Sequence, residues 1–270
     1  MSIAAMHAAA TGMEALDTKL NVVANNLANI NTVGFKKSRV NFEDLLYQTM
    51  REPGMRDYED RPVPHGIQVG LGVGVSGTQL DFTHGPIDPT DRKLDLAIGG
   101  EGFFQVRTVN NGEELIAYTR AGNLVRNADG DLVLANSEGS ILEPPINIPE
   151  NVPENGIVIA NNGRVAVRQE GSSQLIEVGQ IELARFVNPE GLLTIGKNLY
   201  IETDASGTPI TGNPLEEGLG DLMQGVLEGS NVDPVRELVD LIFTQRGFEL
   251  NSQSIKSADE ALQVVTNLRR

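Results

Sequence analysis

The chain has 270 residues, which is long enough to bury a sizeable core and to form two domains. Its formal net charge of −16 argues against binding to nucleic acid or to an anionic membrane, because no basic stripe is present to collect phosphates. The absence of cysteine excludes disulfides and thiolate metal sites. Residues 1–50 and 234–270 each contain equal numbers of acidic and basic side chains, so the excess negative charge lies in 51–233. We therefore expect neutral ends that can pack against copies of themselves, and a solvated acidic middle.

The sequence predicts neither a membrane span nor a cleaved secretory signal. No apolar run reaches the length of about eighteen residues that a membrane-spanning helix needs. The first basic residue is Lys19, and no continuous apolar segment precedes a cleavage site. We expect no membrane insertion, and any export would use an uncleaved signal.

The N-terminal segment predicts a long amphipathic helix over residues 2–31. Apolar side chains recur there at steps of three and four, and no proline interrupts them. Gly34 stands just beyond the pattern, where a left-handed C-terminal cap favours glycine. Burial of one apolar stripe does not offset the cost of ordering an isolated helix, so the helix needs a partner. The stripe consists of Ile3, Met6, Ala10, Met13, Leu16, Leu20, Val23, Leu27 and Ile30.

The C-terminal segment predicts a second helix. Asp233 can cap it, Pro234 suits its first turn, and no later proline follows. We expect the two helices to pair as a coiled-coil stem, within one subunit or between subunits. The alternative is two core helices of a single globule. The second stripe is weaker because it includes polar and small residues: Val235, Leu238, Ile242, Gln245, Phe248, Ser252, Ile255, Ala258, Leu262 and Val265.

The segment between the first helix and residue 66 is harder to assign. Lys36, Lys37 and Arg39 form a basic patch that we interpret as a solvated helix end. Residues 41–50 are compatible with one short amphipathic helix. Residues 51–66 contain three prolines and two glycines, which predicts an extended connector or a hairpin that is ordered by its neighbours.

From Ile67 onward the sequence predicts antiparallel β structure. Residues 67–75 alternate between apolar and small or polar side chains, and prolines at 144–153 mark an irregular crossing between two β halves. Short β-rich runs are expected at 94–98, 103–109, 115–119, 132–134, 157–159, 164–168, 176–186, 198–202 and 223–227. Hairpin turns are expected at Asn111-Gly112, Asp129-Gly130, Asn155-Gly156 and Asn162-Gly163.

The expected fold class is thus α+β, with terminal helices and a mostly antiparallel β middle. We expect an N-terminal stem helix, a connector with a stem-proximal β region, a β-rich outer domain, a return connector and a C-terminal stem helix. Their respective ranges are 1–35, 36–93, 94–203, 204–232 and 233–270.

One string resembles a nucleotide-binding motif. Residues 72–77 spell Gly-Val-Gly-Val-Ser-Gly, but a dinucleotide site requires a helix to open there. The residues that follow predict a strand instead. We therefore expect no nucleotide site and no other cofactor site.

The remaining polar residues do not predict catalysis or metal binding. His7, His65 and His84 stand in three separate contexts, and single histidines are usually structural or solvated. The aspartates at 88, 91 and 95 do not have the spacing of a calcium loop, because Pro89 and Arg92 interrupt them. With no nucleophile, base and oxyanion donors in one pattern, we expect a protein that is not an enzyme.

Several blocks resemble the axial proteins of the bacterial flagellum. The asparagine-rich strings at 24–29 and 31–36 are the N-terminal signature of those proteins. Further blocks resemble the family at 94–98 with 102–104, at 118–122, at 224–232 and at 245–249. The chain is similar to the flagellar basal-body rod protein family over nearly its whole length. Gly247 departs from the alanine expected there, and a glycine inside a helix costs about 1 kcal/mol.

Within that family the chain is most similar to the distal-rod members. The length and residues 42–49 with Pro53-Gly54 carry this likeness. Hook proteins are similar at both ends but are usually longer, and proximal-rod proteins generally lack this connector. A subunit of the hook or proximal rod is one alternative. A β-domain enzyme or carbohydrate-binding protein, oligomerised by its helices, is the other.

The resemblance implies a structural subunit of a rigid helical tube that carries motor torque across the periplasm to the hook. It implies a homopolymer that meets other axial proteins, the cell-wall and outer-membrane bushing rings, and the type III export apparatus. We expect the asparagine amides to bridge the backbones of adjacent subunits. The expected interface residues are Ile3, Met6, Met13, Leu16, Leu20, Val23, Asn25, Asn26, Leu27, Asn29, Ile30, Asn31, Phe35, Leu238, Ile242, Phe248, Ile255, Leu262 and Val265. The expected bracing residues of the connector are Leu45, Leu46, Tyr47, Pro53 and Gly54.

Overall fold

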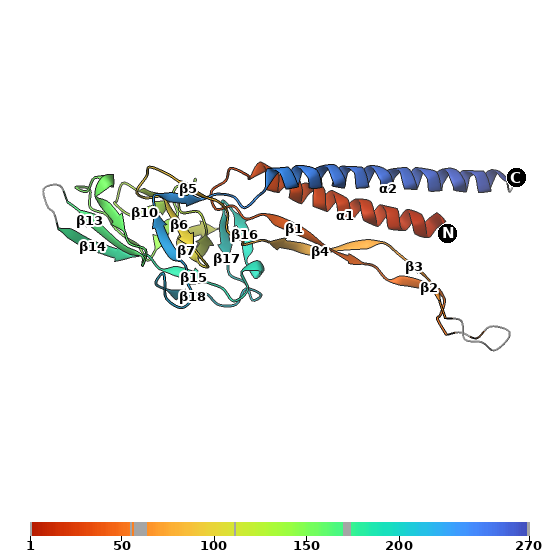
Figure 1. The fold of residues 1–270 in the computed structure, drawn as a ribbon, viewed down its shortest axis with the longest axis horizontal. Coiled ribbons are helices and arrows are strands. Elements are labelled where there is room, and N and C mark those ends of the chain that lie inside the picture. The colour runs from red at the N-terminus through yellow and green to blue at the C-terminus, as the bar shows by residue number, and fades with distance from the viewer. Residues whose placement is uncertain (1, 55, 57–63, 111, 170–173, 269–270) are drawn as a thin grey trace. The chain divides into compact units, whose positions relative to one another are not determined.

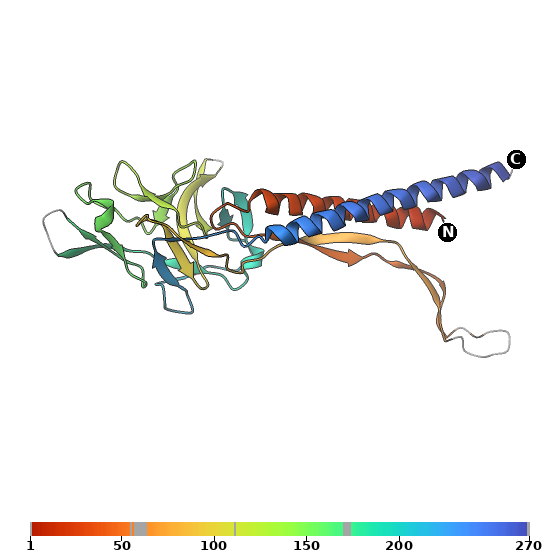
Figure 2. The same ribbon diagram turned by 45° about the horizontal axis from the view of Figure 1, so that its top comes forward.

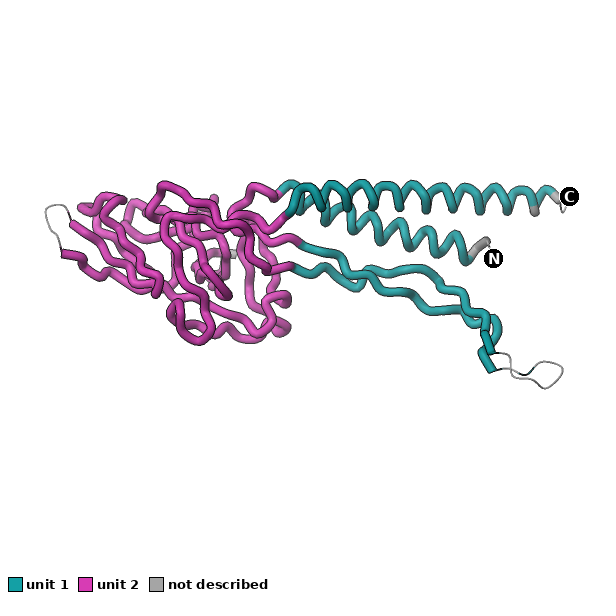
Figure 3. Tube along the Cα trace, in the orientation of Figure 1, with its two compact units in different colours: residues 1–28, 38–80, 233–270 teal, residues 29–37, 81–232 magenta. Residues whose placement is uncertain are grey.

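The computed structural model describes residues 2–54, 56, 64–110, 112–169 and 174–268, and the side chains of 2, 3, 110, 265 and 268 lie outside this description. The chain forms two compact units, which Figure 3 colours separately. Unit 1 contains Met1–Ala28, Ser38–Leu80 and Asp233–Arg270, and unit 2 contains Asn29–Lys37 and Asp81–Val232. The segment expected as a return connector, 204–232, thus belongs to unit 2.

Unit 1 contains both helices, α1 (Ser2–Ala28) and α2 (Pro234–Leu268). They lie side by side in Figures 1 and 2. The helices run antiparallel, because Lys19 of α1 pairs with Asp240 at the beginning of α2, whereas Gly12 packs on Asn251 farther along. In the described part of the chain, neither helix is long and apolar enough to cross a membrane.

The helix ends are only partly as predicted. The Asp233 Oδ1 atom accepts hydrogen bonds from the Val235 and Arg236 amides at 3.0 and 3.3 Å, so the predicted cap is confirmed. At the other end, α1 stops at Ala28 rather than at residue 31. The Thr32 amide and hydroxyl bond instead to the backbone and side-chain oxygens of Asn29, and such local bonds compete with the helix.

Gly34 does not cap α1, although its backbone is left-handed as predicted. It lies six residues beyond the helix, with a φ of 69°, and its amide donates to the Glu228 carbonyl at 2.8 Å. A Cβ atom there would lie 2.6 Å from the Ala121 nitrogen. Glycine is therefore required by close backbone packing inside unit 2 as well as by its φ angle.

The short helix expected over 41–50 is wrong, because this segment forms two strands. In unit 1, β1 (Ser38–Asp44) pairs antiparallel with β4 (Val73–Leu80), and β2 (Tyr47–Arg51) pairs with β3 (Ile67–Gly70). Together they make a long two-stranded ribbon (Figure 1). Cross-strand pairing such as Phe42 opposite Val75 overrides the weak local helical pattern.

Unit 2 is built from antiparallel strands, as predicted. Among the described residues, its largest sheet has nine strands, in the order β16-β17-β8-β7-β11-β10-β9, with β15 pairing to β7 and β18 pairing to β15. A three-stranded sheet, β12-β13-β14, and the pairs β19-β6 and β20-β5 complete the unit. The strands are β5 (Ile87–Pro89), β6 (Leu96–Gly99), β7 (Phe103–Asn110), β8 (Glu113–Thr119), β9 (Leu124–Arg126), β10 (Leu132–Leu134), β11 (Ile141–Glu143), β12 (Ile157–Ile159), β13 (Arg164–Arg168), β14 (Leu175–Gln180), β15 (Leu183–Arg185), β16 (Leu193–Gly196), β17 (Leu199–Ile201), β18 (Ile210–Gly212), β19 (Asp221–Gln224) and β20 (Val226–Glu228). Two short 3₁₀ helices lie at Glu154–Gly156 and Pro189–Gly191.

Most predicted strands are present, with shifted ends. The predicted strands at 132–134, 157–159 and 164–168 match β10, β12 and β13 in both bounds. The predicted strand at 223–227 is divided by Gly225, which has a φ of 78°. The hairpin turn predicted at Asn155-Gly156 is wrong, because these residues belong to the first 3₁₀ helix. Five short strands were not predicted, namely β5, β9, β11, β16 and β18.

The core of unit 2 is apolar and includes the proline-rich crossing. Ile146 and Ile148 of that crossing are fully buried, together with Leu96, Phe104 and Leu142 of the surrounding strands. A cluster of edge-to-face aromatic rings adds to this core. The rings are those of Phe82, Phe103, Tyr118, Phe186 and Tyr200.

Candidate assembly surfaces

The face of α2 that meets α1 combines polar and small residues with the half-buried Leu241, Ile255 and Leu262. Thr244 is buried, and a Cβ atom on Gly247 would lie 3.1 Å from the Leu16 side chain. Across the helix pair, a Cβ atom on Gly12 would lie 3.0 Å from the Asn251 amide. Small residues at these positions let the two backbones approach closely. The departure from alanine at Gly247 thus lies directly opposite Leu16.

The apolar face of α2 is on the opposite side of the helix and is exposed. Val235 and Phe243 expose 68% and 69% of their surface. At 100° per residue, most of the exposed apolar positions lie on the far side of the helix from the line through Thr244, Gly247 and Asn251, whereas Phe248 lies nearer to that line. Much of the predicted stripe therefore faces away from α1. The exposed apolar residues of α2 are Val235, Leu238, Val239, Ile242, Phe243, Phe248, Leu250 and Val264.

The predicted stripe of α1 lies mainly in contact within unit 1. Val23 is buried, and the remaining described members are half-buried apart from Ala10, which is exposed. The half-buried members are Met6, Met13, Leu16, Leu20 and Leu27. In α2, Ile255 and Leu262 are half-buried, whereas Phe248 is exposed. The side chains of Ile3 and Val265 lie outside the described part of the chain.

Asn26 is buried and is bonded inside its own chain. Its Oδ1 atom accepts from the Ser38 amide at 2.9 Å, and its Nδ2 atom donates to the Ser38 carbonyl at 2.8 Å. The same Nδ2 atom lies 3.3 Å from the Glu237 carboxylate. One amide thus joins α1, the first residue of β1 and the first turn of α2. This is a different role from the bridge between subunits that we expected for Asn26.

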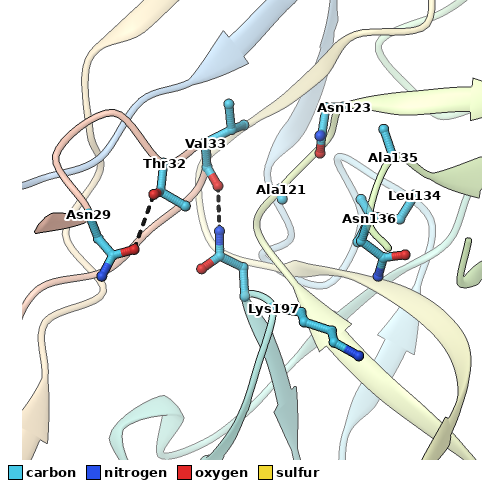
Figure 4. Close-up of a pocket in the computed structure, with 10 residues that line it drawn as sticks. Asn29, Thr32, Val33, Ala121, Asn123, Leu134, Ala135, Asn136 and Lys197 are labelled. Atoms are coloured by element: carbon cyan, nitrogen blue, oxygen red, sulfur yellow. Dashed lines mark hydrogen bonds between the residues drawn. The ribbon is translucent and has the colours of Figure 1, made fainter. Parts of the chain in front are cut away.

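The other expected asparagines and their neighbours lie nearer to the surface. Asn25 and Asn31 are exposed, and Asn29, Ile30 and Phe35 are half-buried. Asn29 and Thr32 line a hollow of unit 2 that is rich in amides, together with Asn123, Asn136 and Asn198. In Figure 4 the Thr32 hydroxyl points to Asn29, and Asn198 donates to the Val33 carbonyl at 2.8 Å. Segment 29–37, which is part of unit 2, is therefore held to the rest of that unit by polar side chains.

The strongest electrostatic feature of unit 2 is a buried cluster around Glu228. Lys36 lies 2.7 Å from one carboxylate oxygen and Arg120 lies 3.5 Å from the other. Lys36 and Glu228 are each 1% exposed, and Arg120 is 3% exposed. Lys36 also donates to the Thr83 carbonyl at 2.7 Å, and the Gly85 amide donates to the Glu228 carboxylate at 3.1 Å. The interpretation of Lys36 as a solvated residue is wrong.

Burial shifts the proton affinities of the basic groups in this cluster. It lowers the pKa of Lys36, which Glu228 opposes, and it lowers the pKa of Arg120. The pKa of the nearby His84 is also lowered, first by burial and then by the charge of Arg120. Lys36 and Arg120 share the Glu228 carboxylate in a desolvated site, so the negative charge of Glu228 is needed to offset the cost of burying the two cations.

Sequence reasoning did not predict this cluster. Lys36, Arg120 and Glu228 come from three separate blocks of the family resemblance. Their occurrence in those blocks was the available signal. Only the fold brings together residues that are 192 and 108 positions apart.

The predicted bracing residues all lie on or next to the ribbon of unit 1. Leu46 is 84% exposed, Tyr47 is exposed and Leu45 is half-buried against Gly74. Pro53 and Gly54 form a turn after β2 and are exposed. Residues 55 and 57–63 of the expected connector lie outside the described residues.

In the motif at 72–77, Gly72 directly precedes β4 and the other residues lie in that strand, so no helix begins there and the motif lacks the geometry of a dinucleotide-binding element. Among the described residues, no group of three or more His, Asp or Glu side chains is placed to hold a metal ion. His7 donates from Nδ1 to the Leu71 carbonyl at 3.0 Å, and Asp95 accepts from the Thr90 hydroxyl at 2.8 Å. These residues have structural partners.

The comparisons with known proteins agree on one family. Three family models match, described as flagella basal body rod protein over residues 6–36, flagellar hook protein FlgE/F/G D1 domain over 97–167, and flagellar basal body rod FlgEFG protein C-terminal over 223–268. Among solved structures, the Helicobacter pylori flagellar hook protein FlgE2 aligns with a TM-score of 0.24 and 16% identity, over 71% of this chain and 43% of that one. So low a score carries no argument about the fold.

Curated relatives cover nearly the whole chain. The flagellar basal-body rod protein FlgG of Buchnera aphidicola (subsp. Acyrthosiphon pisum) is 44% identical over 96% of both chains. The FlgG protein of Borreliella burgdorferi is 42% identical over 98% of both chains. That of Caulobacter vibrioides is 44% identical over 98% of this chain and 99% of its own. The chain belongs to the flagellar basal-body rod protein family.

Proposed function

We propose that this protein is a structural subunit of the flagellar rod, specifically of the distal rod, that self-assembles into a rigid helical tube. In this role it is not an enzyme; it transmits motor torque across the periplasm to the hook. The observation that carries the proposal is the exposed apolar face of α2, because monomeric proteins rarely expose such apolar patches and a patch of this kind marks a contact with another protein. Near-full-length similarity to proteins named flagellar basal-body rod protein FlgG supports the same assignment.

The apolar face of α2 requires a partner from another subunit. The apolar side chains on the side of α2 that meets α1, such as Leu241 and Ile255, are half-buried, whereas those on the other side stay in water, so the intramolecular contact leaves much apolar surface of α2 unburied. In the assembled tube, the exposed face that contains Leu238 and Ile242 packs on neighbouring copies, and α1 and α2 pair as a coiled-coil stem. Residues 1–50 and 234–270 carry no net charge, which permits this close packing of identical chains.

The asparagine-rich segment after α1 provides polar register between subunits in this proposal. The amides of Asn25, Asn29 and Asn31 bond to backbone groups of adjacent copies, because an apolar interface alone leaves register loosely specified. Asn26 instead holds the local structure of each subunit. Phe35 and Ile30 contribute apolar area beside these amides.

The ribbon of unit 1 braces neighbouring subunits. Exposed apolar side chains on a two-stranded ribbon, such as Leu46 and Tyr47, are best explained by contact with another copy. Deletion of residues 52–66, with β2 and β3 rejoined by a short turn, should leave assembly intact and produce bent filaments. Electron microscopy of straight filaments from this variant would contradict the bracing role.

The acidic unit 2 forms the outer layer of the tube. Charged surface without large apolar patches suits smooth rotation inside the bushing rings of the cell wall and outer membrane. The subunit reaches the periplasmic basal body through the flagellar type III export apparatus, without cleavage of a signal peptide. It joins proximal-rod and hook-side axial proteins at the two ends of the distal segment.

Polymerisation of purified protein tests this function. The double variant Ile242→Ser/Phe243→Ser should lose sedimentable filaments, because it removes two central side chains of the exposed face of α2. The matched control Leu193→Ser changes an exposed leucine of unit 2 and should polymerise normally. Hydrogen exchange adds a second measurement. Residues 2–28 and 234–268 should exchange freely in dilute monomer and become protected in filaments; protection already present in a monomer that never polymerises would refute the proposal.

A further inference from the structure

The ribbon of unit 1 contacts α1 at the break between its two pairs of strands, where its direction changes (Figure 1); we refer to this point as the bend. At the bend, the Leu45 amide donates to the Gly72 carbonyl at 3.0 Å and the Leu71 amide donates to the Leu46 carbonyl at 3.1 Å. The breaks between β1 and β2 and between β3 and β4 therefore face each other across the ribbon. The direction of the distal half of the ribbon is set at this point.

Gly72 permits unusually close contact between the bend and α1. Its φ is 120°, and a Cβ atom on it would lie 2.1 Å from the Thr11 Oγ1 atom and 3.1 Å from the Ala8 Cα atom. Such a φ angle is unfavourable for residues with a side chain, and at 2.1 Å a Cβ atom would force the Thr11 hydroxyl out of its position. Glycine is the residue that allows both the backbone conformation and the approach.

Two side chains of α1 hold the bend from the helix side. Thr11 donates its hydroxyl to the Ala8 carbonyl at 3.1 Å, and the same oxygen accepts from the Val73 amide at 3.4 Å. One turn before, the His7 ring donates to the Leu71 carbonyl at 3.0 Å. Three consecutive residues of the ribbon, 71–73, are therefore in register with one turn of α1.

Beyond the bend, the ribbon has little other support. Tyr47, Met50 and Ile67 of its distal half are exposed. A two-stranded ribbon in water is marginal by itself, so small torsional changes at the bend would move its distal half over a long distance. The contact with α1 therefore determines whether the distal half of the ribbon has a fixed direction or moves relative to α1.

We propose that Gly72 and Thr11, supported by His7, form a clamp that fixes the direction of the ribbon on α1, so that ordering of α1 during assembly also orients the brace. The clamp rests on the rod function proposed above. Gly72 and Thr11 are positioning residues in this device. The glycine string that resembles a nucleotide motif thereby has a mechanical explanation, because its first glycine is the point of close approach.

A distance measurement tests the clamp. Because the chain has no cysteine, Glu14→Cys on α1 and Gln48→Cys on β2 introduce two nitroxide labels at exposed sites. Pulsed electron spin resonance is recorded in filaments diluted with unlabelled protein, so that only distances within one subunit contribute. The clamp predicts a single narrow distance distribution in filaments and a broad one in the dilute monomer.

Three variants separate the clamp from general folding. Gly72→Ala should broaden the distribution severalfold in filaments. Thr11→Ala should also broaden it, although alanine favours helix formation and cannot unfold α1. Gly77→Ala is the matched control, because a Cβ atom there meets nothing within 4 Å and the distribution should stay narrow. If Gly72→Ala and Thr11→Ala leave the distance distribution as narrow as Gly77→Ala does, the clamp is overturned while the rod function stays intact. Failure of the wild-type protein to form filaments would refute the rod function, and the clamp with it.

Discussion

Glu228→Gln is the most informative single substitution in unit 2. It keeps the shape of the side chain but removes the carboxylate that lies between the buried Lys36 and Arg120. Removing one partner of a buried ion pair costs about 3–5 kcal/mol, because the other charge stays desolvated and unpaired. At about 2 kcal/mol per molar urea, the unfolding midpoint of unit 2 should fall by about 1.5–2.5 M.

The measurement uses the buried tyrosines of unit 2. Tyr118 and Tyr200 are each 3% exposed, and the chain has no tryptophan, so tyrosine fluorescence follows the unfolding of this unit. Glu177→Gln removes an exposed carboxylate and serves as the control. The double variant Lys36→Met/Glu228→Gln should recover part of the loss, because it also removes one of the two buried cations.

The loss caused by Glu228→Gln should also depend on pH. Burial already lowers the pKa of Lys36, and without Glu228 that pKa falls further. A lysine whose pKa is lower in the folded state destabilises the fold while it is charged, and this cost disappears as pH rises above the folded pKa. The difference in unfolding free energy between wild type and Glu228→Gln should therefore shrink in alkaline buffer. A midpoint equal to that of Glu177→Gln at all pH values would refute the reasoning.

Three further predictions concern other packed groups. The pKa of His84 is lowered in the folded state, so as pH falls the histidine is protonated in the unfolded chain before it is protonated in the folded one. The unfolding free energy of unit 2 should therefore decline as pH falls below about 6.5. In urea titrations between pH 5 and 8, His84→Asn should remove that component, and an unchanged pH profile would exclude His84 as its source. Asn26→Ala should destabilise unit 1 by about 1–3 kcal/mol, because it leaves the Ser38 amide and carbonyl unpaired, and it should reduce filament yield in sedimentation. Normal assembly would show that the link between α1 and β1 is dispensable. Gly122→Ala should prevent folding of unit 2, since a Cβ atom would lie 1.9 Å from the Leu96 carbonyl oxygen. A native near-ultraviolet circular dichroism spectrum from this variant would contradict the close approach of these two backbones.

Local signals were sufficient for several elements. Asp233 and Pro234 define where α2 begins, because a cap and a first-turn proline act within one turn of helix. The strands at 132–134 and 164–168 follow from β-branched and aliphatic residues bounded by turn pairs. The asparagine-rich blocks indicate the family from the sequence alone, and the curated relatives confirm it.

Other features depend on residues that are distant in the sequence. Residues 41–50 have a weak helical period, yet they form strands because 67–80 provide a partner ribbon. Both sides of α2 carry apolar residues, so periodicity alone could not tell which side meets α1. The side that contains Thr244 and Gly247 meets α1, because these small residues let the two helices approach closely.

The sequence by itself determined the two terminal helices, the antiparallel β middle and the family, because caps, periodicity and turn residues act over a few neighbouring positions. The tertiary structure alone decided which face of α2 is exposed, and it alone brought Lys36 and Arg120 to Glu228. The physical reason is that desolvation and ion pairing depend on the neighbours that the fold supplies, and a linear pattern does not contain them.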